Sequence, residues 1–172
     1  MITDTPLVQA RGLAKSFGDF RAVAGVDFSI MPGESFGFLG PNGAGKTTTL
    51  ECLEGMRKTD AGSLRIAGCD PQSEGQKLRS RLGVQLQSSS LPDSMTVGEA
   101  FELFSAWHGV EADPRLAERF NIAELSSKQF KQLSTGQKRR LQLVLALVNH
   151  PQVIILDEPT AGLDVQSRAS LH

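Results

Sequence analysis

Some residue types are scarce in this sequence of 172 residues. It contains no tyrosine, one tryptophan and two cysteines, Cys52 and Cys69. Neither cysteine belongs to a CxxC pair or has histidine-rich surroundings, which are the usual signs of a metal site. We therefore expect two reduced thiols, as in most proteins of the cytosol.

Long apolar runs and an excess of charge of one sign are also missing. The longest apolar stretch, Leu141–Val148, has eight residues and includes Gln142, whereas a membrane span needs about 20. Residues 1–6 lack the basic and apolar segments of a signal peptide. The formal net charge is −1, from 18 basic and 19 acidic residues, so the composition gives no reason to expect a nucleic-acid partner. We expect a soluble, cytoplasmic chain that reaches a membrane only through a partner.

Glycine is abundant, and apolar residues follow the patterns of regular secondary structure. The 17 glycines exceed average usage, which indicates several positions of unusual backbone geometry or close backbone approach. Alternating or continuous apolar residues predict strands at 8–13, 26–30, 35–39, 64–67, 82–86 and 153–156. Helices are predicted at 46–56, where Gly55 ends the helix, and at 76–81, 114–120 and 136–149. The run 153–156 is typical of a strand buried on both faces.

The middle of the chain, residues 88–149, is interpreted as a mostly helical insertion. Thr96–Glu99 has the pattern of a capping box, and apolar residues follow it at helical spacing. Among them, Phe101, Phe104 and Trp107 are interpreted as packing residues. The alternative is a groove that receives a helix of a partner.

The segment Gly40–Thr47 matches the pattern GxxxxGK[ST] between a predicted strand and a predicted helix. Glycines allow a tight loop to wrap a phosphate chain with its N–H groups, and the following helix adds the positive end of its dipole. Lys46 supplies a charge to the β- and γ-phosphates, and the Thr47 hydroxyl is a hard oxygen ligand for Mg²⁺. The segment therefore predicts an ATP-Mg²⁺ site.

Asp157 and Glu158 follow directly on the apolar run 153–156. The carboxyl end of a parallel strand is where open α/β sheets bind ligands. There Asp157 is suited to hold Mg²⁺, and Glu158 to orient and polarise an attacking water. Alone, the pair reads equally well as an acidic turn after a strand, but the phosphate loop upstream favours the catalytic interpretation.

A second candidate anion site is Leu133–Gln137, with the sequence LSTGQ. A serine hydroxyl, a glycine backbone and a helix N-terminus together suit an anion. Taken alone, the segment is more simply an N-capped helix start, with Ser134 as the cap.

Three segments, Gly40–Thr47, Leu133–Gln137 and Leu156–Asp164, resemble in order and separation the nucleotide-binding domain of ATP-binding-cassette (ABC) ATPases. The resemblance implies that Gly40–Thr48 is the Walker A loop and Val153–Asp157 the Walker B strand. It makes residues 133–137 the signature, with threonine at position 135 where the family usually has glycine.

The resemblance also implies a role for each site residue. Catalytic roles fall to Glu158 as the base, with Lys46 and Gln87. Mg²⁺ ligands are Thr47, Gln87 and Asp157. ATP contacts fall to Phe17, which stacks on adenine, and to Gly40, Pro41, Asn42, Gly43, Ala44, Gly45, Lys46, Thr47, Thr48, Ser134, Gly136, Gln137 and Asp164. For Gln87 a plain loop glutamine is the alternative, and for Phe17 a core or edge aromatic.

The implied fold is an α/β P-loop NTPase: a RecA-like parallel core sheet, an antiparallel β subdomain and a helical insertion. Residues 1–87 form the antiparallel β and Walker A part, 88–149 the helical signature part, and 150–172 the Walker B and D-loop part of one domain. The family's switch histidine lies well beyond the catalytic glutamate, and His172 follows Glu158 too closely to be it. We therefore expect an incomplete cassette that lacks the C-terminal part of the core.

The implied function is ATP binding and hydrolysis in a subunit of an ABC transporter, on the inner face of the cell membrane. The expected partners are a second ATPase chain, joined head to tail as a homo- or heterodimer, and transmembrane permease subunits. The sequences of residues 83–87 and 135–141 resemble those of efflux-type ATPases. The alternatives are a soluble ABC ATPase without a transport role and a nucleotide-binding fragment without hydrolysis.

Overall fold

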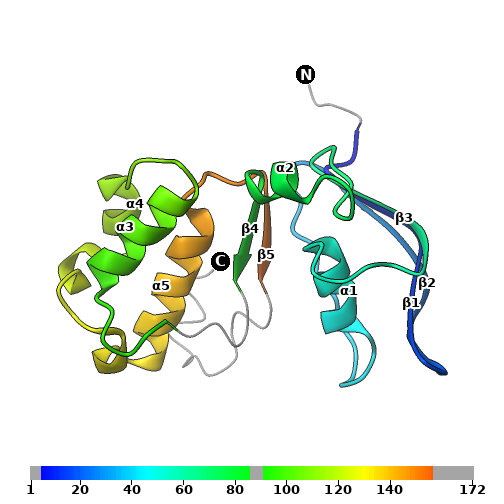
Figure 1. The fold of residues 1–172 in the computed structure, drawn as a ribbon, viewed down its shortest axis with the longest axis horizontal. Coiled ribbons are helices and arrows are strands. Elements are labelled where there is room, and N and C mark those ends of the chain that lie inside the picture. The colour runs from blue at the N-terminus through cyan, green and yellow to red at the C-terminus, as the bar shows by residue number, and fades with distance from the viewer. Residues whose placement is uncertain (1–4, 86–90, 157–172) are drawn as a thin grey trace. The chain divides into compact units, whose positions relative to one another are not determined.

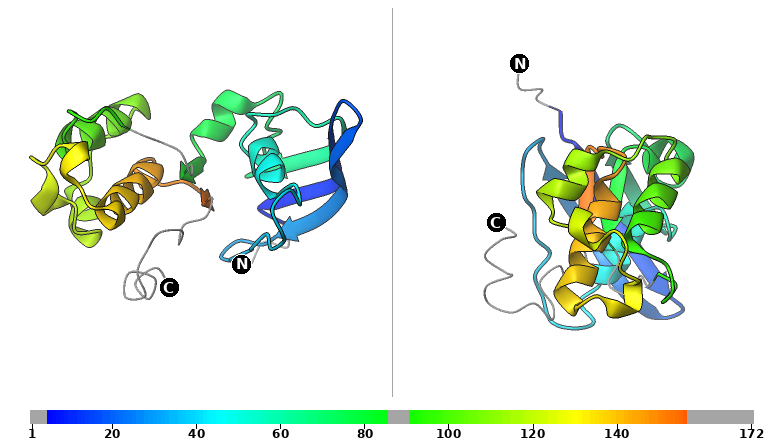
Figure 2. Two further views of the ribbon diagram at one scale, coloured as in Figure 1. Left: turned by 90° about the horizontal axis from the view of Figure 1, so that it is seen from below. Right: turned by 90° about the vertical axis from the view of Figure 1, so that its left-hand side faces the viewer.

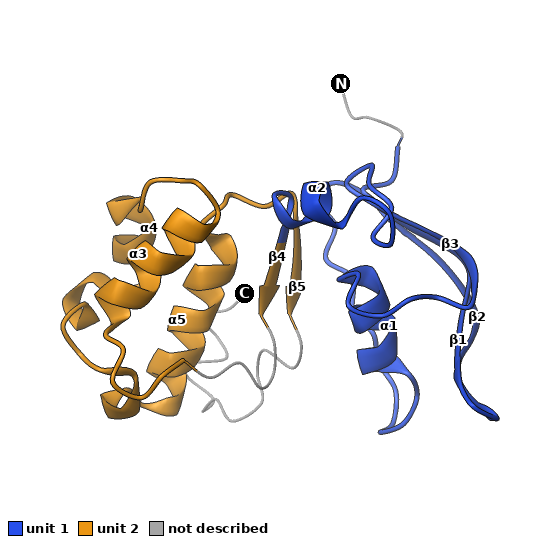
Figure 3. Cartoon of the chain, viewed as in Figure 1, with its two compact units in different colours: residues 1–82 blue, residues 83–172 orange. Residues whose placement is uncertain are grey.

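The computed structural model describes residues 5–85 and 91–156, and the chain divides into two units, residues 1–82 and 83–172 (Figure 3). Predicted site residues outside the described ranges are Gln87, Asp157, Glu158 and Asp164. Their roles stay predictions, as does the division at residues 87 and 149.

In the first unit, a long hairpin and one further strand form an antiparallel sheet. The hairpin strands are β1 (Val8–Phe17) and β2 (Phe20–Ile30), and β3 (Ala61–Ile66) pairs with the other edge of β1, so the order is β2-β1-β3. Alternating residues of β1, such as Val8 and Ala10, are buried. This confirms the half-buried strand predicted at residues 8–13. The strand predicted at 26–30 is present within β2, where Phe28 and Ile30 are half-buried but Val26 is exposed.

Two helices accompany this sheet. Helix α1 (Lys46–Leu53) lies over one face of the sheet (Figures 1 and 2), and Gly55, with a φ of 73°, follows it as predicted. Helix α2 (Gly75–Arg79) is shorter. Cys52 and Cys69 are free and fully buried, and burial raises the pKa of the Cys52 thiol. A raised pKa keeps the thiol protonated and unreactive.

The segment predicted as a strand at residues 35–39 is not one in the described structure. This segment contacts β2 through side chains and not through backbone pairing: the ring centroids of Phe36 and Phe38 lie 5.5 Å and 5.3 Å from that of Phe28. Leu39 is 96% exposed. The pattern is apolar enough for a strand, but a strand also needs a hydrogen-bonded neighbour, and the described residues offer this segment none.

Strand β4 (Leu82–Gln85), all but its first residue in the second unit, pairs with β5 (Val153–Leu156), and the two run in the same direction (Figure 1). Burial of β5 on both faces is not observed: Ile155 is buried, but Ile154 is 44% exposed. The reason is that one side of the pair is covered by helix. A Cβ built on Gly83 of β4 would come within 2.1 Å of the carbonyl oxygen of Ala146.

The rest of the second unit is helical, and its helices lie together in both Figure 1 and Figure 2. They are α3 (Val97–Trp107), α4 (Pro114–Arg119) and α5 (Thr135–Leu147), with short 3₁₀ turns η1 (Ala123–Leu125) and η2 (Phe130–Gln132). The predicted capping box opens α3, because Thr96 and Glu99 satisfy each other's backbone N–H groups.

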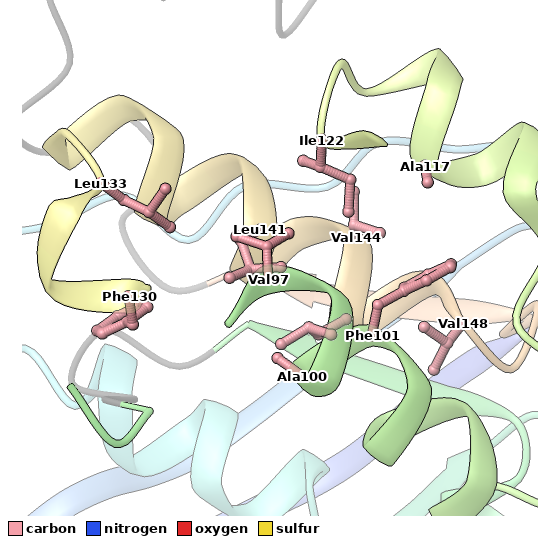
Figure 4. Packing of buried hydrophobic residues seen from close by; sticks show 11 residues of the cluster. Val97, Ala100, Phe101, Ala117, Ile122, Phe130, Leu133, Leu141, Val144 and Val148 are labelled. Carbon is pink, nitrogen blue, oxygen red and sulfur yellow. The ribbon is translucent and has the colours of Figure 1, made fainter. Parts of the chain in front are cut away.

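One cluster of buried side chains joins these helices (Figure 4). Its members are Val97, Ala100, Phe101, Ala117, Ile122, Phe130, Leu133, Leu141, Val144, Leu145 and Val148. Phe104 packs against it, so the packing prediction is confirmed for Phe101 and Phe104. It is wrong for Trp107, which is 75% exposed. Helical spacing places Trp107 on the stripe of Phe104, but α3 ends at this residue and the side chain stands outside the cluster.

This difference predicts unequal effects of truncating two aromatic side chains of α3, Phe101 and Trp107. Phe101→Ala should lower the free energy of unfolding by about 3–5 kcal/mol, because it leaves a cavity in the cluster. Trp107→Ala should cost less than about 1 kcal/mol, because the indole is already in water. Urea unfolding followed by circular dichroism measures both. Equal losses would contradict the assignment of Trp107 to the surface.

Candidate functional site

The predicted phosphate loop precedes α1 and presents its backbone to solvent. Residues 40–44 are exposed, and Gly43 and Gly45 both have a φ of 83°, in the left-handed region that favours glycine. Gly45 is the N-cap of α1 and, having no side chain, makes no capping hydrogen bond. The first turn of α1 also carries no acidic residue. The N–H groups at this helix start thus remain available to an anion.

Gly45 is held against the hairpin. A Cβ built on it would lie 2.2 Å from the carbonyl oxygen of Ala22 on β2, far inside van der Waals contact. Below it, the buried side chain of Thr49 donates a hydrogen bond of 2.9 Å to the Gly45 carbonyl. The sheet and the first turn of α1 together therefore fix the end of the loop.

The Lys46 ammonium lies over the start of the same loop. It donates hydrogen bonds to the carbonyl oxygens of Gly40, at 2.7 Å, and Pro41, at 2.9 Å. Thr47, the next residue, is exposed, and Thr48 is half-buried. The structure thus brings together a positive charge, a hydroxyl and uncapped N–H groups within one loop and one helical turn. This donor set suits a phosphate chain with Mg²⁺, for which Thr47 is the one proposed ligand within the described residues.

Phe17 ends β1, and the β1–β2 turn lies at the same end of the first unit as the loop before α1 (Figure 1). The ring is 41% exposed and is therefore not a core residue. Two cations lie beside it: the Arg57 guanidinium at 4.9 Å and the Lys15 ammonium at 5.8 Å from the ring centroid. The sequence reasoning missed both, because they come from different segments and match no motif.

The proposed signature segment, Leu133–Gln137, lies at the start of α5. The structure shows the N-capped helix start that the segment taken alone predicted, with Ser134 as the cap. Ser134 accepts a hydrogen bond from the Gln137 N–H at 3.2 Å, and the Gln137 side chain accepts one from the Ser134 N–H at 2.9 Å. Ser134 is exposed, and Gly136 and Gln137 are half-buried. The hydroxyl proton of Ser134 is still a donor after its oxygen has accepted a bond. The cap therefore does not prevent a contact with an anion.

Hydrogen bonds favour the ionised forms of two charged groups near Phe17, Asp60 and Arg57. The hydrogen bond from Lys15 and a second from the Ser16 N–H lower the pKa of Asp60, and the bond to Glu51 raises the pKa of Arg57. Because the Asp60 carboxylate is favoured in the folded state, its contribution to stability is present at neutral pH. It is lost as the pH falls below the ordinary range of aspartate.

The chain matches the ABC transporter family over residues 23–161, and it belongs to that family. It is 39% identical to the Nod factor export ATP-binding protein I of Ralstonia nicotianae, over 97% of this chain and 54% of that protein. It is 43% identical to the protein of the same name from Paraburkholderia xenovorans, over 90% and 53% respectively. The chain thus spans about half the length of these curated relatives.

Solved structures of ABC transporter cassettes share the fold. An ATP-binding cassette in its ADP conformation superposes with a TM-score of 0.84 at 23% identity, covering 97% of this chain and 74% of that one. An ATP-binding subunit of an ABC transporter gives a TM-score of 0.85 at 24% identity, over 96% and 71%. These likenesses confirm the predicted P-loop NTPase fold class. Within residues 5–85 and 91–156, no helix is long and apolar enough to cross a bilayer.

The two left-handed glycines of the loop allow a matched test of the contact with β2. Gly43 and Gly45 have the same φ, but nothing lies within 4 Å of a Cβ built on Gly43. Gly43→Ala should therefore cost about 1 kcal/mol, for the backbone conformation alone. Gly45→Ala should cost about 3 kcal/mol or more, because the methyl group overlaps the Ala22 carbonyl. Urea unfolding of the two variants gives the difference, and similar stabilities would refute the close approach.

Proposed function

We propose that the chain is the ATP-binding and ATP-hydrolysing part of an ABC transporter subunit. The observation that carries the proposal is the uncapped start of α1, where Gly45 leaves the N–H groups open and Lys46 lies over the loop. This arrangement suits a triphosphate better than a neutral ligand, because the helix dipole and the lysine both favour negative charge.

Each residue of the site has one task in this proposal. Loop N–H groups and Lys46 bind the phosphates, and Thr47, Gln87 and Asp157 would hold Mg²⁺. Mg²⁺ supplies charge neutralisation at the phosphate oxygens. Glu158 orients the attacking water and accepts its proton.

The proposed partners follow from membership of the family. A second ATPase chain would face the loop of this one with its own Ser134–Gln137 segment, and Asp164 is proposed as a further ATP contact. In such an arrangement, the exposed and capped start of α5 would contact the nucleotide that is bound by the phosphate loop of the other chain. The other partner is a transmembrane permease, which would hold the chain at the cytoplasmic face of the membrane.

For the direction of transport, the proposal is export. Its support is the name shared by the relatives cited above, which are ATP-binding proteins of Nod factor export at 39% and 43% identity. Export also agrees with the efflux-type character of residues 83–87 and 135–141.

Nucleotide binding is tested by removing the loop cation. Lys46→Ala should abolish MgATP binding measured by isothermal titration calorimetry, because the ammonium is the only side-chain charge in the loop 40–47. Lys128→Ala, at an exposed lysine of the second unit, is the matched control and should bind as the unchanged protein does. Unchanged binding by the Lys46 variant would refute the phosphate-loop assignment.

Hydrolysis is tested at Glu158, in a protein that carries this chain within a complete cassette. Glu158→Gln should stop phosphate release while stabilising an ATP-bound dimer in gel filtration, because the site still binds ATP but lacks the base. Glu124→Gln, at an exposed glutamate, serves as the control. A Glu158 variant with normal turnover would show that another group is the base.

A further inference from the structure

Phe17 sits within a group of four charged residues, which we name the Phe17 clamp: Lys15, Glu51, Arg57 and Asp60. The Arg57 guanidinium lies 4.9 Å and the Lys15 ammonium 5.8 Å from the ring centroid. Both distances fall within the range of cation–π attraction. The contacts leave the ring 41% exposed, so part of its surface remains for a ligand.

Arg57 is itself anchored to α1. Its Nε donates to a Glu51 carboxylate oxygen at 2.5 Å, and its backbone N–H donates to the Glu51 carbonyl at 3.1 Å. Glu51 belongs to α1, the helix that begins with Lys46. A chain of contacts therefore runs from the phosphate-loop helix through Glu51 and Arg57 to the ring of Phe17.

Lys15 is anchored from the other direction. Its ammonium lies 2.6 Å from the Asp60 carboxylate, which also accepts the N–H of Ser16 at 2.7 Å. The Asp60 N–H in turn donates to the Ala14 carbonyl at 2.9 Å. These bonds fix the backbone just before Phe17 and leave the orientation of the ring to Arg57.

A phenylalanine at this position needs such support. The phenyl ring carries no hydroxyl or N–H group, so no hydrogen bond of its own can fix it. An exposed phenyl ring without a partner would sample several rotamers, and a base that stacks on it would have to select one. A guanidinium against the ring removes that freedom before the ligand arrives.

We propose that Arg57 is a positioning residue for nucleobase recognition: anchored by Glu51 on α1, it holds the Phe17 ring in the orientation on which adenine stacks. The inference rests on the proposed binding of ATP, with adenine stacked on Phe17 as the family resemblance implies. It adds that the platform is tied to the helix that binds the phosphates. Recognition of the base and of the triphosphate then share one rigid element.

Two probes separate the base from the phosphates: MgATP, and magnesium tripolyphosphate, which has no base. The test variant carries Glu51→Gln with Arg57→Gln, which leaves the net charge unchanged. Calorimetry should show MgATP binding weakened about two- to fivefold, the size of an exposed cation–π contact, and tripolyphosphate binding unchanged. The matched control is Asp113→Asn with Arg115→Gln, an ion pair of the second unit at 3.1 Å, and should change neither.

Phe17→Ala distinguishes failure of the inference from failure of the proposed function. It should weaken MgATP about fivefold or more, as loss of a stacked base does, without affecting tripolyphosphate. If it leaves MgATP unchanged, the adenine platform itself is refuted, and the role of Arg57 with it. If Phe17→Ala weakens MgATP but the paired variant does not, only the role of Arg57 is refuted.

A double-mutant cycle shows whether Arg57 acts through Phe17. In the Phe17→Ala background, the paired substitution should cause no further loss of MgATP affinity, because the ring that it positions is gone. An undiminished further loss would mean that Arg57 contacts the nucleotide itself. An equal weakening of tripolyphosphate and MgATP would mean a general effect on α1. Either result overturns the proposal.

Discussion

The candidate site depends on one close approach of two backbones. Gly45 adopts a left-handed conformation and lies where a side chain would overlap the Ala22 carbonyl of β2. The absence of a side chain allows α1 to begin against the hairpin, and it also leaves the helix start without a cap. The same residue therefore fixes the position of the loop and opens its N–H groups to an anion. The Lys46 ammonium over the loop completes this arrangement.

The two helix starts of the proposed composite site are built in opposite ways. The start of α1 has no capping side chain, whereas α5 is closed by the reciprocal bonds of Ser134 and Gln137. An uncapped start gains most from a bound anion, because its N–H groups have no other partner within the helix. A capped start is stable by itself, because the Ser134 oxygen already binds the Gln137 N–H, and it still offers the Ser134 hydroxyl proton and the N–H groups that the cap does not bind. This asymmetry agrees with a proposal in which α1 binds the phosphates of its own chain and α5 serves the partner.

Local patterns in the sequence predicted local structure well. The capping box at Thr96, the glycine stop after α1 and the periodic segments of α4 and α5 all correspond to elements of the structure. In each case the stabilising contact joins residues a few positions apart. The Walker A loop was predictable for the same reason, since its glycines and lysine act within one short segment.

Features that depend on distant residues were not predictable. The strand expected at residues 35–39 needs a neighbour that the described residues do not supply, and Trp107 falls outside the cluster because α3 ends there. The Phe17 clamp joins β1 to α1 and to residues beyond it, so Asp60 meets Lys15 across 45 positions of sequence. Such contacts follow from the packing of the hairpin and α1, which no local pattern encodes.

The central claim, that the start of α1 binds the phosphates of ATP, is tested most directly by the backbone amide resonances of the chain during titration with MgATP. An anion that accepts hydrogen bonds from N–H groups shifts their proton resonances. The account predicts that the largest shifts fall on residues 43–48, at the uncapped helix start. Shifts confined to other segments, such as residues 134–137, or no shifts at saturating MgATP, would contradict it.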